Sequence, residues 1–357
     1  MSTPKLNILN HVSDWLYDIS PNELHSKLSG PTLIHLTGHR EEPVFVSVLL
    51  HGNETTSFFA IQELLKHYRE QKLPRNLSIF IGNIEAAKHN LRRLENQVDY
   101  NRVWNHAGFY HDSSEAEVMA QVVDEMRRRN VFVSIDIHNN TGLNPHYACI
   151  NRLEDSFYHL ATLFSRTVIY FTHPQGVQSQ AFAELCPAVT VECGQVGHER
   201  GTLHARQYIE ACLGLSALPA HPIPKHDIDL FHTVATVKIA PNISFAFENH
   251  SENHIENQSE GQSSDANADV LFTNDLDKSN FSELPAGTTL AKVSHKVTAP
   301  ITVTNEHGRE MYSEYFTIYD HELRTSCPLM PSMLTTDEYV IEKDCLCYLM
   351  ERMTQLA

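Results

Sequence analysis

Two histidines and two glutamates stand where hydrophobic stretches of the sequence end. His51 and Glu54 follow Val44–Leu50, His138 follows Val131–Ile137, and Glu192 follows Ala188–Val191. Two histidines with one glutamate form the ligand set of catalytic zinc sites that keep one coordination position open. His51 and Glu54 also have the spacing of ligands at a turn that opens a helix. We therefore expect His51, Glu54 and His138 to bind a metal ion.

Glu192 would remain outside this ligand set. A carboxylate beside such a site serves as a general base, because the metal lowers the pKa of water toward about 7 and the carboxylate accepts the proton. Asp136 stands two residues before His138 and is a candidate hydrogen-bond partner for that imidazole. This combination predicts metal-assisted hydrolysis.

The His-x-x-Glu spacing is weak evidence on its own. It recurs at His67–Glu70 and at His307–Glu310, and neither copy follows a buried strand and opens a helix. The chain has 23 histidines, so most of them are expected to be surface or packed core residues. In one alternative, His51, Glu54 and His138 do not meet, and the chain forms an ordinary doubly wound domain.

A cluster of cations stands out in this acidic sequence. It suits an anion, because the arginine fork binds a carboxylate through two hydrogen bonds and can stabilise an oxyanion. In the alternative, Arg92 and Arg93 lie on a solvated turn. Their ion-pair partners are then Glu95 and Asp99, and the pairs contribute little. The members of the cluster are Lys88, Arg92, Arg93 and Arg102.

Hydrophobic, β-branched runs alternate with amphipathic stretches over the first part of the chain. This alternation is typical of a largely parallel sheet with helices on both faces. Such sheets place ligand sites beyond the carboxyl ends of their strands, where the candidate residues stand. The predicted strands are Thr32–Leu36, Val44–Leu50, Leu77–Ile81, Val131–Ile137, Tyr147–Ile150, Val168–Phe171 and Ala188–Val191. The predicted helices are Ser57–Tyr68, Glu115–Arg128 and Leu203–Leu215.

A proline-rich segment, Leu218–Pro224, interrupts this pattern, and strand-like alternation follows it. We place a domain boundary there, with a hydrolase domain at residues 1–222 and a C-terminal β-rich domain at 223–357. A loop at about 248–269 is too polar to be buried. The predicted fold class is therefore mixed α/β, with a largely parallel central sheet between two layers of helices and a smaller β-rich domain.

The composition is that of a folded globular protein, with 357 residues, 41% hydrophobic and 20% charged. Its formal net charge of −17 argues against nucleic acid or an anionic membrane as a partner, because both would repel it. No apolar run approaches the roughly 20 residues of a membrane span. The first residues lack the features of a secretory signal, and the seven cysteines form no disulfide or zinc pattern. We expect a cytoplasmic protein.

Four motifs occur in an order that is typical of one hydrolase family. They are His51-Gly-Asn-Glu54, Asn101-Arg102, Asp136-Ile-His138-Asn139 and Val191-Glu192-Cys-Gly194. At these residues the sequence resembles the zinc carboxypeptidase clan, and more closely its aspartoacylase/succinylglutamate desuccinylase branch. The similarity spans about residues 30–215 and continues more loosely into the C-terminal part. It implies a zinc-carboxypeptidase-like fold.

The resemblance also implies a metal and a mechanism. One Zn²⁺ per chain would be held by His51, Glu54 and His138, although such a site accepts other divalent ions as well. Glu192 would activate the water that attacks an amide carbonyl. A second metal ion, near Glu192 or near the segment that begins at Asn139, is left open by the sequence.

The basic residues take their expected roles from the same resemblance. The arginine that polarises the carbonyl in the family corresponds to Arg93. Arg92 is the alternative, because the spacing to the next motif is one residue longer than expected for the family. Asn101 and Arg102 correspond to the pair that binds the substrate carboxylate.

The departures from the family concern the substrate. The arginine that aspartoacylase uses for a second carboxylate has no counterpart, since no Arg or Lys occurs from Thr167 to Val191. Asn139 and Asn140 instead suggest recognition of a more neutral substrate through hydrogen bonds.

We therefore expect a zinc-dependent amidohydrolase or metallopeptidase that cleaves a small N-acyl amino acid or a short peptide carrying a carboxylate. A first alternative is a metallocarboxypeptidase that acts on peptides, which requires an open groove. A second alternative, of another class, is a non-catalytic protein in which the metal organises a binding pocket for an anionic metabolite.

Overall fold

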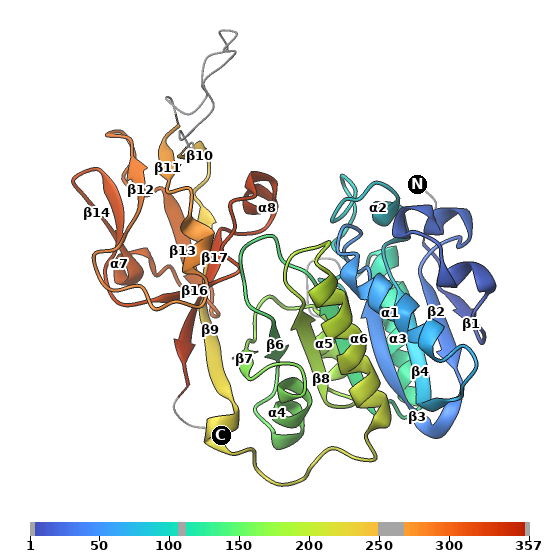
Figure 1. Cartoon of the computed structure of the whole chain (residues 1–357). Coiled ribbons are helices and arrows are strands. Elements are labelled where there is room, and N and C mark those ends of the chain that lie inside the picture. Colours follow the sequence, from blue (N-terminus) through green and yellow to red (C-terminus); the bar gives the residue numbers. More distant parts are fainter. Residues whose placement is uncertain (1–3, 106–111, 249–267, 354–357) are drawn as a thin grey trace. The chain divides into compact units, whose positions relative to one another are not determined.

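The computed structural model of the chain describes residues 4–105, 112–248 and 268–353 (Figure 1). It divides into two compact units. The first takes in the described residues of 1–140, 146–231 and 353–357, and the second those of 141–145 and 232–352. The chain passes into the second unit after Phe231, beyond the predicted boundary at 222/223, because one long strand belongs to both units. The predicted polar loop at about 248–269 lies almost entirely outside the described residues.

The first unit contains eight strands of one sheet and most of the helices. Its strands are β1 (Asn7–Leu9), β2 (Thr32–Leu36), β3 (Gly38–Val48), β4 (Leu73–Ile81), β5 (Val133–His138), β6 (Tyr147–Ile150), β7 (Thr167–Tyr170) and β8 (Ala188–Glu192). Its α-helices are α1 (Thr56–His67), α2 (Ile84–Lys88), α3 (Ser114–Arg128), α4 (Asp155–Thr162), α5 (Gln178–Phe182) and α6 (Glu199–Gly214). The predicted strands Thr32–Leu36 and Tyr147–Ile150 are confirmed with the same bounds.

The order of these strands is β1-β2-β4-β3-β5-β8-β6-β7. Four central strands, β4, β3, β5 and β8, run parallel to one another. Every residue of β5 and β8 is buried, as expected of strands that are covered on both faces. The predicted fold class, a mixed and largely parallel sheet with helices and a smaller β part, is confirmed.

Helices α1 and α6 pack side by side against this sheet (Figure 1). The buried side of α1 carries Phe58, Ile61, Leu64 and Leu65, which recur at helical spacing. Full burial of such side chains contributes about 1.5–3 kcal/mol each. This packing fixes the start of α1, and with it the turn that joins β3 to α1.

Strand β3 begins six residues before the predicted start at Val44, at Gly38. The added residues are mostly polar, which is why the hydrophobic pattern did not include them. They nevertheless pair with β4, since Arg40 is in register with Arg75. A Cβ at Gly38 would lie 2.2 Å from the Arg75 carbonyl carbon, so only glycine allows the two strands to approach here.

The second unit is built mainly from antiparallel strands. Strand β9 (Asp229–Ile239) enters it from the first unit and pairs there with β13 (Ile301–Asn305), and β16 (Met330–Ser332) pairs with β17 (Cys347–Arg352). A separate sheet has the order β10-β11-β12-β15-β14. Its strands are β10 (Phe245–Phe247), β11 (Val270–Phe272), β12 (Thr289–Val293), β15 (Glu322–Thr325) and β14 (Phe316–Tyr319). Two short helices, α7 (Tyr312–Tyr315) and α8 (Glu338–Lys343), complete the unit.

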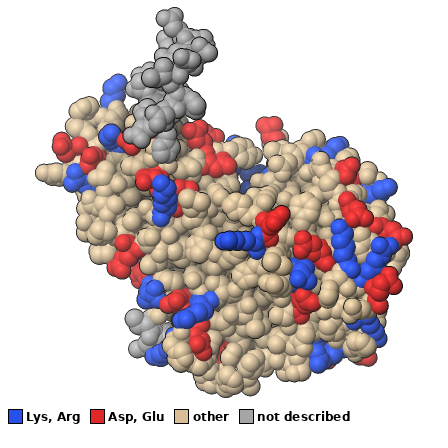
Figure 2. All heavy atoms as spheres, viewed as in Figure 1, with Lys and Arg blue, Asp and Glu red and all other residues tan. Residues whose placement is uncertain are grey.

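Figure 2 shows one face of the molecule, on which acidic and basic side chains are interspersed rather than separated by sign. Among the described residues, no helix combines the length and the apolar character that a membrane crossing requires.

Gly52 ties the turn after β3 to helix α2. Its backbone N–H donates to the carbonyl of Arg92, at 3.1 Å. A Cβ at this position would lie 2.2 Å from the Ala87 nitrogen and 2.4 Å from the Ala86 carbonyl carbon. Those are backbone atoms of a buried helix, so they cannot move aside cheaply. The candidate ligands on either side of Gly52 therefore depend on the absence of a side chain here.

We predict that Gly52→Ala lowers the free energy of unfolding by about 1–3 kcal/mol, as overpacking generally does. It should also lower metal affinity, because the turn must shift. Urea denaturation and metal titration measure the two effects. Gly214→Ala is the matched control: a Cβ built there meets no atom within 4 Å outside its chain neighbours and the backbone of its own helix. Equal stability of the two variants would contradict the packing argument.

Candidate metal centre

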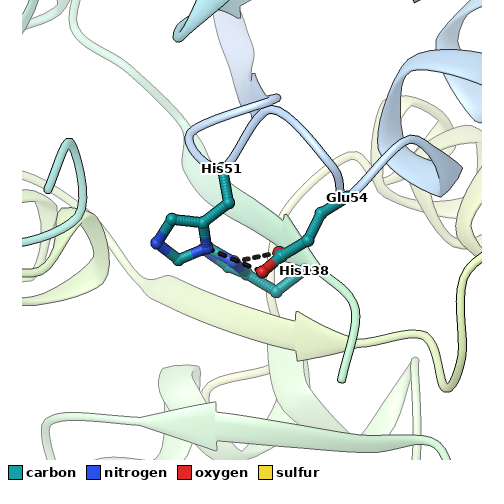
Figure 3. Close-up of side chains that lie close together, drawn as sticks. All are labelled: His51, Glu54 and His138. Carbon is teal, nitrogen blue, oxygen red and sulfur yellow. Dashed lines mark hydrogen bonds and ion pairs between the residues drawn. The ribbon is translucent and has the colours of Figure 1, made fainter. Parts of the chain in front are cut away.

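His51, Glu54 and His138 come together at the carboxyl edge of the parallel strands. One ligand atom of each residue lies within 4.8 Å of the other two, and all three side chains are buried. His51 and Glu54 belong to the turn between β3 and α1, and His138 is the last residue of β5. Figure 3 shows both imidazoles directed at the Glu54 carboxylate, with dashed lines joining the rings to it. The expectation that these three residues meet is confirmed.

The two histidines present equivalent atoms to the shared glutamate. Nδ1 of His51 lies 2.7 Å from Glu54 Oε1, and Nδ1 of His138 lies 2.7 Å from Glu54 Oε2 (Figure 3). Burial opposes ionisation of Glu54, but the two histidines outweigh it and hold the pKa of this carboxyl well below its usual value. The group therefore offers two Nδ1 atoms and an ionised carboxylate at one point.

A second carboxylate stands behind each imidazole. Asp136 Oδ2 lies 2.8 Å from Nε2 of His138, and Asp99 Oδ1 lies 3.1 Å from Nε2 of His51. Such partners fix the ring orientation and the tautomer of a ligating histidine, with Nε2–H donating to the carboxylate. Asp136 is itself oriented by the Ser47 hydroxyl, which donates to Oδ1 at 2.6 Å.

Sequence reasoning missed this contact of Asp99. It treated Asp99 only as an ion-pair partner of the arginines, and that contact also exists, since the Arg92 guanidinium lies 3.4 Å from Asp99 Oδ2. Burial opposes ionisation of Asp99, but His51 and then Arg92 hold its pKa well below the usual value. No local pattern in the sequence indicated this contact, because His51 and Asp99 are 48 positions apart.

This donor set fits a divalent metal ion of the zinc type. Zn²⁺ prefers imidazole nitrogen and carboxylate oxygen, and three such ligands leave a position for water or substrate. Both histidines have their outer nitrogen held by a carboxylate, so both inner nitrogens are available as acceptors. In the described part of the chain, no other group of three histidine, cysteine, aspartate or glutamate side chains comes together. The described residues therefore offer no separate site of this kind for a second metal ion.

Glu192 is the last residue of β8 and lies beside the metal group without joining it. Its register partner on the neighbouring strand is His138, so both side chains emerge on the same side of the sheet. Burial raises the pKa of Glu192 to about 7, against the opposing charge of His138. A buried carboxyl with this pKa accepts and returns a proton near neutral pH.

Asn139 and Asn140 hold the turn that carries Glu192. The Asn139 side-chain amide donates to the Gly194 carbonyl at 2.7 Å, and the Asn140 amide donates to Glu192 Oε2 at 3.5 Å. The backbone N–H of Cys193 donates in turn to the His138 carbonyl at 3.0 Å. The segments that end β5 and β8 are thus joined side by side.

The structure separates the two adjacent arginines. The guanidinium of Arg92 lies 3.5 Å from Glu54 Oε1, with its side chain 18% exposed. Arg93 points elsewhere and donates to the backbone carbonyl of Gln97 at 2.8 Å. Arg92, the alternative from the sequence, is therefore the one that reaches the metal group.

Asn101 belongs to the centre through its own hydrogen bonds. Its Nδ2 lies 3.0 Å from His138 Nε2 and 3.3 Å from Asp136 Oδ2, and its Oδ1 accepts from the Gln178 backbone. Arg102 is partly buried and donates to the Asn101 carbonyl at 2.8 Å. The resemblance assigns Asn101 and Arg102 together to the substrate carboxylate, but in this structure the two side chains have different surroundings.

The fold is mixed α/β, and the carboxyl edge of its parallel strands carries a candidate metal site of two histidines and one glutamate. Residues 42–217 match the family model described as the succinylglutamate desuccinylase/aspartoacylase catalytic domain. The predicted resemblance to this family is confirmed over that segment. No curated protein sequence matches the chain.

Solved structures share the fold over nearly the whole chain at low sequence identity. A succinylglutamate desuccinylase/aspartoacylase from Rhodobacter sphaeroides is 11% identical with a TM-score of 0.55, covering 89% of this chain and 88% of its own. The succinylglutamate desuccinylase of Chromobacterium violaceum is 13% identical with a TM-score of 0.53, covering 89% and 87%. Murine aminoacylase 3 is 12% identical with a TM-score of 0.52, covering 89% and 97%. These likenesses concern the fold.

We predict that Asp99→Asn lowers the affinity for Zn²⁺ by about 10- to 100-fold, because the His51 ring loses its ionised partner. Competition with a chromophoric chelator measures this. Glu95→Gln is the control, since Glu95 is an exposed acid of the same segment. Unchanged affinity in the Asp99 variant would show that the contact does not support the ligand.

Proposed function

We propose that the protein is a zinc-dependent amidohydrolase that cleaves a small N-acyl amino acid carrying a free carboxylate. The observation that carries this proposal is the position of Glu192. It is buried, it lies in register with a candidate ligand, and it stays outside the ligand group. A protein that only bound a metabolite at the metal would gain nothing from this carboxylate.

In the proposed hydrolysis, metal binding and proton transfer are the roles of different residues. His51, Glu54 and His138 would hold Zn²⁺, which supplies Lewis acidity that acidifies water and polarises the scissile carbonyl. Glu192 accepts the proton of the attacking water and then donates it to the departing amine nitrogen. Its pKa of about 7 suits both directions of this transfer.

We assign the polarising role to Arg92 rather than to Arg93. A guanidinium beside the metal ligands stabilises the negative charge that develops on the carbonyl oxygen. Arg92 has this position through its contacts with Glu54 and Asp99. Arg93 instead bonds to a backbone carbonyl and lacks such contacts in the described structure.

The substrate carboxylate is assigned to Arg102. The Asn101 amide nitrogen donates to Asp136 and its oxygen accepts from the Gln178 backbone, so we give it the role of holding the centre together. The absence of Arg and Lys from Thr167 to Val191 supports an acyl group without a second carboxylate. The odd number and the scattered positions of the cysteines in the sequence support the expected cytoplasmic location.

We predict that Glu192→Gln retains Zn²⁺ but lowers kcat by about 10²–10⁴-fold, because glutamine cannot accept the proton. Elemental analysis and steady-state kinetics separate the two effects. Glu199→Gln, at the exposed start of α6, should keep both metal and turnover. Full turnover in the Glu192 variant would rule out the mechanism.

A second prediction separates the two arginines. Arg92→Lys should lower kcat/KM by at least about tenfold, because the ammonium cannot reproduce the planar fork. Arg93→Lys should stay within about twofold of the unmodified enzyme. The reverse order, at equal zinc content, would return the polarising role to Arg93.

Substrate class is tested by a panel of N-acetyl amino acids, N-succinyl amino acids and dipeptides, with detection of the released amine. Release from N-acetyl amino acids alone is the expected result. Release from dipeptides alone would instead establish the metallocarboxypeptidase alternative. Binding without any release would establish the non-catalytic alternative.

A further inference from the structure

A pair of histidines outside the metal centre brings two ring nitrogens together. Nδ1 of His146 lies 2.7 Å from Nδ1 of His204, although 58 positions separate the two residues in the chain. His146 stands directly before β6, and His204 lies in the second turn of α6. Both residues are half-buried and keep part of their surface in contact with solvent.

The pair is separate from the metal centre. Tyr147, the first residue of β6, is in register with Glu192 on β8, and Glu192 is in register with the candidate ligand His138 on β5. Neighbouring strands lie about 4.8 Å apart, so about 10 Å of sheet separates the backbones of His138 and Tyr147. His146 adjoins Tyr147 in the chain and therefore stands on the far side of β8 from the metal ligands.

Each ring of the pair has a second contact, with a backbone group. The backbone of Cys193 bonds to the His146 ring and that of Phe164 to the His204 ring, and each bond by itself raises the pKa of its ring. A backbone group with this effect is a carbonyl that accepts an imidazole N–H. Because Nδ1 of each ring faces the other ring, the donor to the carbonyl is Nε2. A Cβ built at Gly194 would lie 3.2 Å from Nε2 of His146, in agreement with this assignment.

This arrangement leaves a lone pair on both Nδ1 atoms. Two lone pairs that face each other at 2.7 Å repel unless a cation lies between them. A shared proton is disfavoured, because burial lowers the pKa of both rings and the charge of His204 lowers that of His146 further. A neutral hydrogen bond between the rings would require one of them to give up its backbone acceptor. A transition-metal ion accepts both lone pairs and leaves both backbone bonds intact.

The same features mark the metal centre of this chain. Its histidines also present Nδ1, these atoms also lie 2.7 Å from the neighbouring ligand, and the two ring centroids are also 5.0 Å apart. A histidine that binds a metal characteristically donates its other N–H to a carboxylate or a backbone carbonyl. Phe164 stacks on the His204 ring, with centroids 4.2 Å apart and an interplanar angle of 7°, and so fixes its orientation.

We infer that His146 and His204 form a second metal site, for a divalent transition-metal ion such as Zn²⁺. Imidazole nitrogen suits Zn²⁺ and its first-row neighbours. Within the described residues no third His, Cys, Asp or Glu side chain joins the pair, so water completes the coordination and binding is weaker than at the metal centre. The ion joins the start of β6 to α6 and stabilises the fold, as any ligand of the folded state alone does. This inference does not depend on the proposed reaction.

Calorimetric titration with Zn²⁺, on the full-length protein whose metal centre is already filled, tests the site. We expect a further equivalent to bind, more weakly than the first. His204→Phe keeps a ring that stacks on Phe164 but removes the ligand nitrogen, so it should weaken this binding at least tenfold. Should that variant fail to fold, His146→Gln takes its place, with the same expected loss.

His159→Phe is the matched control. The rings of His159 and His221 also have centroids 5.0 Å apart, but Nε2 of His159 donates to the His221 backbone carbonyl rather than to its ring. The affinity for the further equivalent should stay within twofold of that of the unmodified protein. A loss as large as that in His204→Phe would overturn the inference.

Thermal unfolding provides a readout that does not rely on binding heat. The further equivalent should raise the Tm of the unmodified protein and leave the Tm of His204→Phe unchanged, because an ion stabilises only the fold that binds it. An equal rise in both proteins would place the ion elsewhere and overturn the inference.

His138→Ala separates the two sites. It should lose the first equivalent and keep the one at His146 and His204, whereas His204→Phe should show the reverse. A further equivalent that persists unchanged in His204→Phe would overturn the inference. Its absence from the unmodified protein up to about 0.1 mM free Zn²⁺ would do so too, and would leave the two rings joined by a proton alone.

Discussion

The carboxylate of Glu54 is the contact around which the centre is arranged. Each of its oxygens faces the Nδ1 atom of a different histidine, and behind each histidine stands an aspartate. Carboxylates and imidazoles therefore alternate through a buried network, which is stable only if each acceptor finds a donor or a cation. A divalent cation satisfies that condition, so binding of the metal and order in the surrounding segments depend on each other. Arg92 supplies a further positive charge from the side, and that explains its contacts with two carboxylates of the same network.

Strand direction decides what lies near this network. Parallel β5 and β8 end at the same edge, so His138 and Glu192 become neighbours although 53 residues separate them in the chain. The hydrogen bonds of Asn139 and Asn140 then join the two ends into one rigid segment. Strand β6 runs antiparallel to β8, so its carboxyl end lies at the opposite edge of the sheet from the metal group. A cavity lined in part by Trp104 lies there. The sheet therefore has the candidate metal group at one edge and a cavity lined by two acidic and two basic side chains at another.

The accuracy of the sequence-based predictions follows the strength of the local signal. β2, β6 and the central helices were predicted well because apolar side chains recur there with the period of their element. The start of β3 was missed, since its first residues are polar and are held only by pairing with β4. Arg92 and Arg93 are adjacent and alike, and their different orientations depend on Gln97 and Asp99, which no periodicity reveals. Asp99 was recognised as an acid near arginines, but its contact with His51 joins residues 48 positions apart.

The sequence by itself determined the ligand types, the order of the motifs and the class of fold. Those properties depend on side-chain chemistry and on hydrophobic patterns within short stretches of the sequence. Only the tertiary structure decided which residues surround them: Asp99 behind His51, Arg92 beside Glu54, and the asparagine amides on the Glu192 turn. It alone also showed the cavity between α3, α5 and the ends of β6 and β7. The physical reason is that a hydrogen bond reaches about 3 Å, so its partner depends on where distant segments pack.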